Sequence, residues 1–272
     1  MRHRSFRRYY CFAPQLFGAL IVLQLISCGT LPPSSSSQKL GEEPTPKLEP
    51  LSPYGNPLSY EVEGITYHVL QSAHGYKEQG VASWYGNPFH GQRASSGETY
   101  NMYEISAAHK TLPLPSYAKV TNLENGRSIT VRINDRGPFV KNRLIDLSYA
   151  AAKRLDIIQK GTALVEVTAI IPGEVPSNGS SLPTQRNCPI KLFVQVGAFG
   201  HEANAQKLAD RLLGLNFQQA FAIEIDDGSA ATHKVRIGPL ASVEEIDQTI
   251  TELEKVGFLN SRSIIERQHC SE

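Results

Sequence analysis

The stretch from residue 80 to residue 152 decides what this chain can be. It reads GVASWYGNPFHGQRASSGETYNMYEISAAHKTLPLP over residues 80–115 and VRINDRGPFVKNRLIDLSYAA over residues 131–151. Glycine, proline, histidine, acidic and aromatic residues are dense in it, and such a composition packs poorly as a regular core. Chains tolerate it where a loop-built site needs particular backbone angles and polar groups. We therefore expect the functional site here.

Three features of this stretch are candidates for chemistry. Glu98 follows a glycine that lets the backbone approach a ligand, His109 follows two alanines, and Asp135 begins an Asp-Arg-Gly-Pro turn. Two carboxyl groups can cleave a glycosidic bond when one protonates the leaving oxygen and the other acts as base or stabilises the cation. Each feature also has a structural alternative, as a turn or a packed imidazole. Asp146 is flanked by core residues and reads as structural, yet remains a possible second acid.

The N-terminus predicts export. Four arginines precede an apolar run at residues 17–26, which is shorter than the roughly 20 residues of a spanning helix. The run ends in Leu25-Ile-Ser-Cys28, which resembles the bacterial lipobox and implies removal of residues 1–27 and lipidation of Cys28. A plain signal peptide with a chance cysteine is the alternative. Gly29 is not the aspartate that commonly retains lipoproteins at the inner membrane, so we expect an outer-membrane anchor facing the periplasm.

Two linkers divide the remaining chain. Residues 28–58 are rich in Pro, Ser, Glu and Lys, which predicts a disordered tether, and residues 172–187 predict a second linker. The formal charge of +1 gives no argument for a nucleic-acid partner. Only Cys188 and Cys270 remain in the mature chain beside the lipidated cysteine, so we expect no thiolate metal site and no cofactor.

The first globular region combines a lead-in hairpin with a small β-barrel. Residues 59–78 alternate around Glu63-Gly64, which predicts the hairpin. Residues 79–171 predict the barrel, with Asn125-Gly126 as a hairpin turn and a short helix over residues 148–155 capped by Ser148. Further strands are expected at residues 81–85, 117–122, 128–133 and 163–171.

Residues 188–268 predict an α+β domain of the order βαββαβ. Strands are expected at residues 191–196, 221–225, 234–237 and 262–266, and helices at residues 202–213 and 243–256. Alternation points Leu192, Val194 and Val196 at the helices. The other face is then expected to expose Phe193, Gln195, Lys234 and Arg236, which suits a sugar chain. An ordinary solvated sheet face is the alternative.

The same region resembles a SPOR domain. The motifs are Phe193-Val-Gln-Val-Gly-Ala-Phe199, Asn204-Ala-Gln-Lys-Leu208 and Val235-Arg-Ile-Gly-Pro239. The resemblance implies binding to peptidoglycan glycan strands that lack stem peptides and accumulate at division septa. Among the four residues of the open face, Gln195 and Arg236 are then the main expected ligand contacts.

The expected topology also predicts a disulfide. In a βαββαβ sheet of the usual order the first and last strands are antiparallel neighbours. Cys188 precedes the first strand and Cys270 follows the last, so the two sulfur atoms are expected to bond. Two free surface thiols are the alternative.

Nearly the whole chain resembles the rare lipoprotein A family. The resemblance rests on these motifs: Gly80-Val-Ala-Ser-Trp-Tyr-Gly86, Phe89-His-Gly91, Ser96-Gly-Glu98, Ala107-Ala-His109, Thr111-Leu-Pro113, Val120-Thr-Asn122, Asn134-Asp-Arg-Gly-Pro138, Ile145-Asp-Leu-Ser148 and Tyr149-Ala-Ala-Ala152. It implies a six-stranded double-psi β-barrel and lytic transglycosylation of peptidoglycan, giving 1,6-anhydro-N-acetylmuramic acid ends at the septum. Divisome proteins are possible partners.

The resemblance also implies roles for individual residues. Asp135 is expected to be the general acid and base, Glu98 to position substrate or stabilise the cation, and His109 to orient one of the two. Tyr85 and Arg136 are expected substrate contacts. A non-catalytic septal glycan-binding lipoprotein and an expansin-like wall-loosening protein are the alternatives to the enzyme.

Overall fold

The computed structural model describes residues 39–174, 190–226 and 231–267. The first element pair is a hairpin of β1 (Ser59–Val62) and β2 (Ile65–His68), which are antiparallel. Glu63 and Gly64 between them both have positive φ, of 52° and 77°. Such angles are those of a two-residue hairpin turn, so the predicted lead-in hairpin is confirmed.

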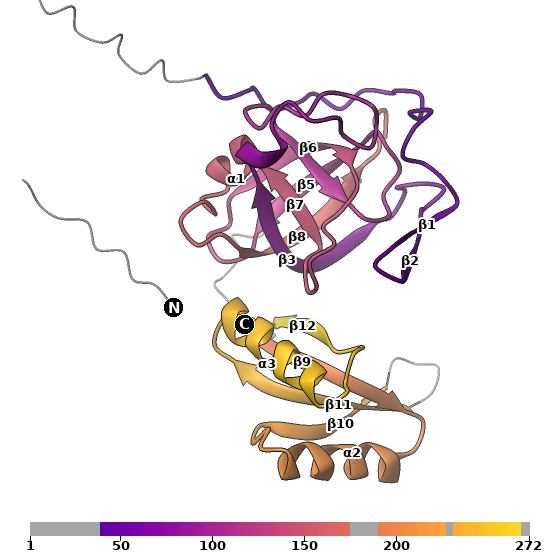
Figure 1. Ribbon diagram of the computed structural model, residues 1–272, viewed down its shortest axis with the longest axis vertical. Helices are drawn as coiled ribbons and strands as arrows, with labels where there is room; N and C mark the ends of the chain where they lie inside the picture. The colour runs from indigo at the N-terminus through magenta and orange to yellow at the C-terminus, as the bar shows by residue number, and fades with distance from the viewer. Residues whose placement is uncertain (1–38, 175–189, 227–230, 268–272) are drawn as a thin grey trace, which may run out of the picture. The chain divides into compact units, whose positions relative to one another are not determined.

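Six strands close into a barrel, as predicted (Figure 1). They are β3 (Lys77–Tyr85), β4 (Ser106–His109), β5 (Ser116–Asn122), β6 (Ser128–Asp135), β7 (Ile145–Ser148) and β8 (Ala163–Ile170), in the spatial order β3-β7-β4-β6-β5-β8. The pairs β3/β7 and β4/β6 are parallel and the others antiparallel. A short 3-10 helix, Asn87–Phe89, follows β3.

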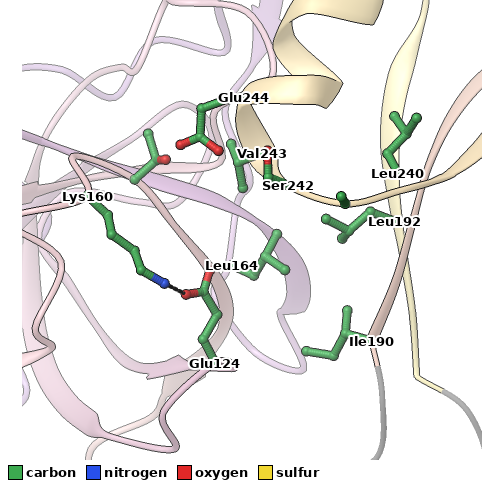
Figure 2. A pocket seen from close by; sticks show the side chains of 11 residues that line it. Glu124, Lys160, Leu164, Ile190, Leu192, Leu240, Ser242, Val243 and Glu244 are labelled. Atoms are coloured by element: carbon green, nitrogen blue, oxygen red, sulfur yellow. Dashed lines mark hydrogen bonds and ion pairs between the residues drawn. The ribbon is translucent and has the colours of Figure 1, made fainter.

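Local sequence signals fix the connections of the barrel. Gly126, with φ of 75°, turns the chain between β5 and β6. Helix α1 (Tyr149–Arg154) begins where the Ser148 hydroxyl accepts a hydrogen bond from Ala151 N at 3.2 Å, as predicted. An ion pair joins two of the connections: Lys160 Nζ, between α1 and β8, lies 2.5 Å from Glu124 Oε2 in the β5–β6 turn (Figure 2).

Residues 39–58, here called the strap, differ from the predicted disordered tether. The strap binds the barrel through its polar groups: Ser52 N donates to Leu114 O at 2.8 Å, and Asn56 Nδ2 donates to the same oxygen at 2.7 Å. Glu43 Oε1 accepts from Thr130 N at 2.6 Å. The tether prediction was wrong for these residues because it considered only apolar burial, whereas the strap is held by hydrogen bonds and ion pairs.

The second domain is a four-stranded sheet with two helices, as predicted. Its elements are β9 (Ile190–Phe199), α2 (Glu202–Gly214), β10 (Ala220–Asp226), β11 (Ala231–Leu240), α3 (Val243–Lys255) and β12 (Arg262–Arg267), and the strand order is β10-β11-β9-β12. Leu192 of β9 lies opposite Leu240 of β11 (Figure 2). Val194, Val235 and Ile246 join them in the core against the helices, which confirms the predicted apolar face.

The opposite face of this sheet is less open than expected. Phe193, Gln195 and Arg236 are only 6%, 7% and 3% exposed, and Lys234 is half-buried. The expectation of a fully exposed face was wrong because these side chains cover one another. The Arg236 guanidinium lies 5.7 Å from the Phe193 ring centroid, and its Nη1 lies 2.5 Å from Glu266 Oε1.

The premise of the disulfide prediction is confirmed: β9 and β12 are antiparallel neighbours, with Ile190 opposite Arg267. Cys188 and Cys270 themselves lie outside the described residues, as does Cys28. We expect a peptide map without reductant to yield one fragment that joins Cys188 to Cys270. In the chain-entropy model a disulfide closing a loop of this length stabilises the folded state by about 4 kcal/mol. Two separate, alkylatable cysteine peptides would contradict this prediction.

The described residues hold neither a membrane-spanning helix nor a cluster of metal-binding side chains. None of the helices there has the length and hydropathy needed to cross a membrane. Within the same residues, no group of three or more His, Cys, Asp or Glu side chains is arranged to hold a metal ion.

Candidate active site

The candidate site is a row of residues that crosses four neighbouring strands. Ser83 of β3 pairs with Asp146 of β7, Asp146 pairs with Ala108 of β4, and Ala108 pairs with Asp135 of β6. We call these four residues the acid row. Paired residues point to the same face of a sheet, so both carboxyl groups project from one face, with only a methyl group between them. At about 4.8 Å per strand, their Cα atoms lie roughly 10 Å apart.

A break in the β4/β6 register brings Asp135 into the acid row. Ala107 pairs with Ile133, but the next residue, Ala108, pairs with Asp135, so Asn134 is the extra residue of a bulge. Without the bulge, Asp135 would alternate with Asn134 and point toward the barrel core that Ile133 occupies.

The Asp135 carboxyl group is held in one orientation. Its Oδ1 accepts hydrogen bonds from Ser95 N at 2.7 Å, Ser95 Oγ at 2.6 Å and Arg136 N at 2.8 Å. All three of these donors converge on Oδ1. Oδ2 is therefore the oxygen that can face a substrate.

Glu98 is held by an arginine that the strap also binds. Arg132 Nη1 and Nη2 donate to Glu98 Oε2 and Oε1 at 2.7 and 2.9 Å, and Asn134 Nδ2 donates to Oε2 at 3.1 Å. Arg132 Nη2 also donates to Glu49 Oε2 at 2.9 Å. The hydrogen bonds from Arg132 hold the pKa of Glu98 below its usual range, against an opposing effect of burial. Glu98 is therefore a carboxylate and not a proton donor at neutral pH.

Asp146 has the opposite electrostatic character. Burial raises the pKa of its carboxyl group above the usual aspartate range, although a hydrogen bond from the Ser83 hydroxyl and the charges of Arg143 and Lys110 oppose the shift. The charge of Asp135 adds to it. Asp146 therefore keeps its proton to a higher pH than an exposed aspartate, as a second acid of a glycosidase-like site would.

A stability measurement tests this reading of Asp146. Because the folded protein binds this proton more tightly than the unfolded chain, its stability falls as pH rises through the raised folded pKa. We expect Asp146→Asn, which retains an acceptor for Ser83, to melt at a higher temperature than wild type at pH 7. The difference should vanish at about pH 4, near the pKa of aspartate in unfolded chains. An equal difference at both pH values would contradict the buried-acid reading.

His109 does not orient either acid in the structure. It alternates with Ala108 on β4, so its ring points into the barrel and is 2% exposed. Nδ1 accepts from Leu112 N at 3.0 Å, and Nε2 lies 2.8 Å from the Tyr76 hydroxyl. Burial, with help from the charges of Arg136 and Lys110, lowers the pKa of His109 to about 3. The expected orienting hydrogen bond was wrong, and a neutral His109 instead anchors the chain that follows β4.

Arg136 was predicted to contact substrate but instead fastens the strap. Its Nε donates to Gly55 O at 2.8 Å, and Nη2 donates to Asn56 Oδ1 at 3.2 Å. Nη1 donates to Leu112 O at 2.5 Å and to His109 O at 3.1 Å. Because its guanidinium group donates to four protein acceptors, Arg136 is a structural residue.

Tyr85, the other predicted substrate contact of the barrel, is largely buried. Its ring stacks on Tyr100, with centroids 4.2 Å apart. Burial raises the pKa of its hydroxyl, and the neighbouring Tyr100, Asp135 and Asp146 add to the shift. Tyr85 is therefore close enough to both acids of the row to feel their charge, but it leaves little surface for a substrate contact.

Neither Arg132 nor Glu49 was predicted from the sequence as a residue of the site. Arg132 stands in an alternating strand pattern, Ser128–Ile133, where an outward charge is ordinary. Glu49 lies in a segment whose composition predicted disorder. Only the folded chain shows that the two residues share an ion-pair network with Glu98.

Comparisons with known proteins agree with this architecture. Residues 77–167 match the family model described as lytic transglycolase, and residues 189–261 match the SPOR domain model. A Vibrio cholerae protein named endolytic peptidoglycan transglycosylase RlpA is 38% identical over 90% of this chain and 94% of its own. A Pseudomonas aeruginosa protein of the same name is 37% identical over 70% of this chain and 71% of its own.

Among solved structures, the SPOR domain of RlpA from Pseudomonas aeruginosa is 26% identical, with a TM-score of 0.25. It covers 28% of this chain and 99% of its own.

Fold and site together define a double-psi β-barrel protein with an acidic site and an appended SPOR domain. The barrel strands and the acid row lie almost entirely within the residues matched by the first family model. The chain belongs to the rare lipoprotein A (RlpA) family, which confirms the resemblance read from its motifs.

Proposed function

We propose that this protein is an endolytic peptidoglycan lytic transglycosylase that cuts peptide-free glycan strands at the division septum. The observation that carries the proposal is the fixed Asp135 carboxyl group, beside a second acid of raised pKa, in a chain closely related to proteins named for this activity. A peptidoglycan-directed protein with a SPOR domain works in the cell envelope. The proposed anchor is lipid on Cys28, in the outer membrane.

The proposed mechanism uses Asp135 first as acid and then as base. Asp135 Oδ2 gives its proton to the oxygen between N-acetylmuramic acid and the next sugar, and the C1–O bond breaks. The C6 hydroxyl of the same N-acetylmuramic acid then attacks C1 and returns its proton to Asp135. Because this nucleophile is part of the substrate, the site needs no bound water. The product is a 1,6-anhydro end.

The other acids support this cycle electrostatically. Glu98 is negative at neutral pH and can stabilise positive charge that develops on the sugar ring. Burial raises the pKa of Asp146, so this side chain places less negative charge near Asp135 than an exposed aspartate would. Like charges in one site oppose each other's ionisation, which favours a protonated acid in the row.

The proposed SPOR contacts have chemical support of their own. Gln195 of β9 pairs with Arg236 of β11. In the described part of the chain, Gln195 Oε1 and Arg236 Nε have no hydrogen-bond partner although both are buried. Unpaired buried polar atoms are costly, and a glycan hydroxyl or amide would satisfy them. Phe193 and Lys234 flank this pair on the same face.

One assay tests the activity. The full-length protein is incubated with sacculi that an amidase has stripped of stem peptides, and soluble products are analysed by mass spectrometry. We expect glycan oligosaccharides of several lengths with 1,6-anhydro ends from stripped sacculi and few such products from untreated ones. Binding without products would favour the non-catalytic glycan binder. Loosened sacculi without products would favour an expansin-like protein.

A further inference from the structure

The strap brings an exposed aromatic residue to the candidate site. Tyr54 is 55% exposed, yet several contacts fix its position. Its backbone N donates to Ser52 Oγ at 3.0 Å, and Ser52 Oγ donates to Ser96 O at 2.7 Å. The next residue, Gly55, accepts the hydrogen bond from Arg136. The tyrosine therefore stands on a fastened segment.

The Tyr54 ring rests on the loop that carries the catalytic groups. A Cβ atom added to Gly97 would lie 2.9 Å from Tyr54 Cδ2, closer than real Cβ contacts allow. Gly97 also has φ of 90°, a backbone angle that residues other than glycine rarely adopt. The loop thus needs glycine here both for its backbone angle and for the approach of the ring.

Arg93 contacts the same tyrosine ring. Its guanidinium carbon lies 4.9 Å from the Tyr54 ring centroid, and its Nη2 would lie 3.3 Å from a Cβ on Gly97. Arg93 and Gly97 therefore both contact the ring, and Tyr54 still keeps more than half of its surface exposed. Guanidinium groups stack on aromatic rings while their N–H groups still donate outward.

The Gly97 loop contacts both carboxyl groups of the proposed reaction, Glu98 by carrying it and Asp135 through Ser95. Glu98 follows Gly97 directly, and Ser95, two residues before it, donates both hydrogen bonds that hold Asp135 from this loop. A lone exposed aromatic is ordinary on a protein surface. Tyr54 differs from such a residue because its ring is fixed against Gly97, between Ser95, which holds Asp135, and Glu98.

We propose that Tyr54 and Arg93 form a glycan subsite that holds one sugar ring next to the cleaved bond. The apolar face of a pyranose ring packs on the exposed part of the Tyr54 ring, and Arg93 donates to hydroxyl or N-acetyl oxygens at its edge. The proposal rests on the proposed function, since it names a further binding residue for the same substrate. It makes the strap part of the site.

Kinetics with soluble peptide-free glycan strands test the subsite. We expect Tyr54→Ala to raise KM by about tenfold with kcat within twofold of wild type, because ground-state binding is lost without a change at the reacting atoms. Tyr54→Phe should behave as wild type. Tyr54→Leu, which can still pack on Gly97, should melt as wild type but share the raised KM. The matched control is Leu48→Ala, on the same strap and 83% exposed, with unchanged KM.

A fluorescence measurement separates binding from cleavage. Trp84 is the one tryptophan of the sequence, so Tyr54→Trp adds a reporter at the subsite. In full-length protein that also carries Asp135→Asn, glycan strands should shift the emission of the added tryptophan, whereas Asp135→Asn alone reports the response of Trp84. Unchanged emission while glycan co-sediments with the protein would overturn the subsite. If wild type releases no products, the proposed function fails, and the emission change still decides the subsite.

Discussion

Replacing Asp135 with asparagine is expected to lower the initial rate at which 1,6-anhydro glycan oligosaccharides are released by about 10³-fold, within the range usual for loss of a general acid. An amide cannot donate the proton that the leaving oxygen needs at neutral pH. The amide oxygen can still accept the hydrogen bonds from Ser95 and Arg136 that now reach Oδ1. The variant should therefore fold and melt like wild type, and product release from stripped sacculi measures the loss.

A surface aspartate supplies the control for this variant. Asp156 pairs with Arg127 at 3.3 Å, and both side chains are more than half exposed. Asp156 has φ of 62°, a backbone angle that asparagine also tolerates. Asp156→Asn should leave the rate unchanged. If Asp135→Asn releases product as fast as wild type, the assignment of Asp135 as the acid fails.

Replacing Arg136 with methionine is expected to reduce the free energy of unfolding of the barrel by about 3 kcal/mol. The change removes the guanidinium hydrogen bonds to Gly55 O, Leu112 O, His109 O and Asn56 Oδ1, of which Asn56 Oδ1 keeps a bond from Leu114 N. It also releases the strap from the loop after β4. Denaturant unfolding followed by Trp84 emission measures the effect, because the sole tryptophan lies in β3 and reports on the barrel.

Arg127→Met is the matched control. It removes an arginine from an exposed ion pair, and exposed pairs contribute about 0–1 kcal/mol. Equal losses for the two variants would show that Arg136 does not fasten the strap. A loss of glycan cleavage by Arg136→Met with unchanged stability would instead restore the predicted substrate contact.

The sequence predicted those parts of the fold that depend on local signals. Asn125-Gly126 and Ser148 act through their own backbone neighbourhood, so the β5–β6 turn and the start of α1 were predicted correctly. Strands β4 and β7 were not predicted. Each has four residues, too few for alternation to stand out, and each is defined by its pairing with distant strands.

The candidate site was predictable in its residue types but not in its geometry. Family motifs indicated Glu98 and Asp135, and the acids proved to share one region of the barrel. The acid row depends on the bulge at Asn134, which no local sequence pattern predicts. His109 was misassigned because a motif records that a histidine is present, not whether its ring faces the site or the core.

The strap would also limit the reach of a barrel that is anchored to a membrane through its N-terminus. If Cys28 carries the proposed anchor, only 11 residues, 28–38, separate the lipid from the first described residue of the strap. A fully extended chain of that length spans at most about 40 Å, whereas the 31 residues of the predicted tether would span about 110 Å. The acid row is then confined to the layer of cell wall nearest the outer membrane. Glycan strands deeper in the wall would come within range only where that membrane is drawn inward.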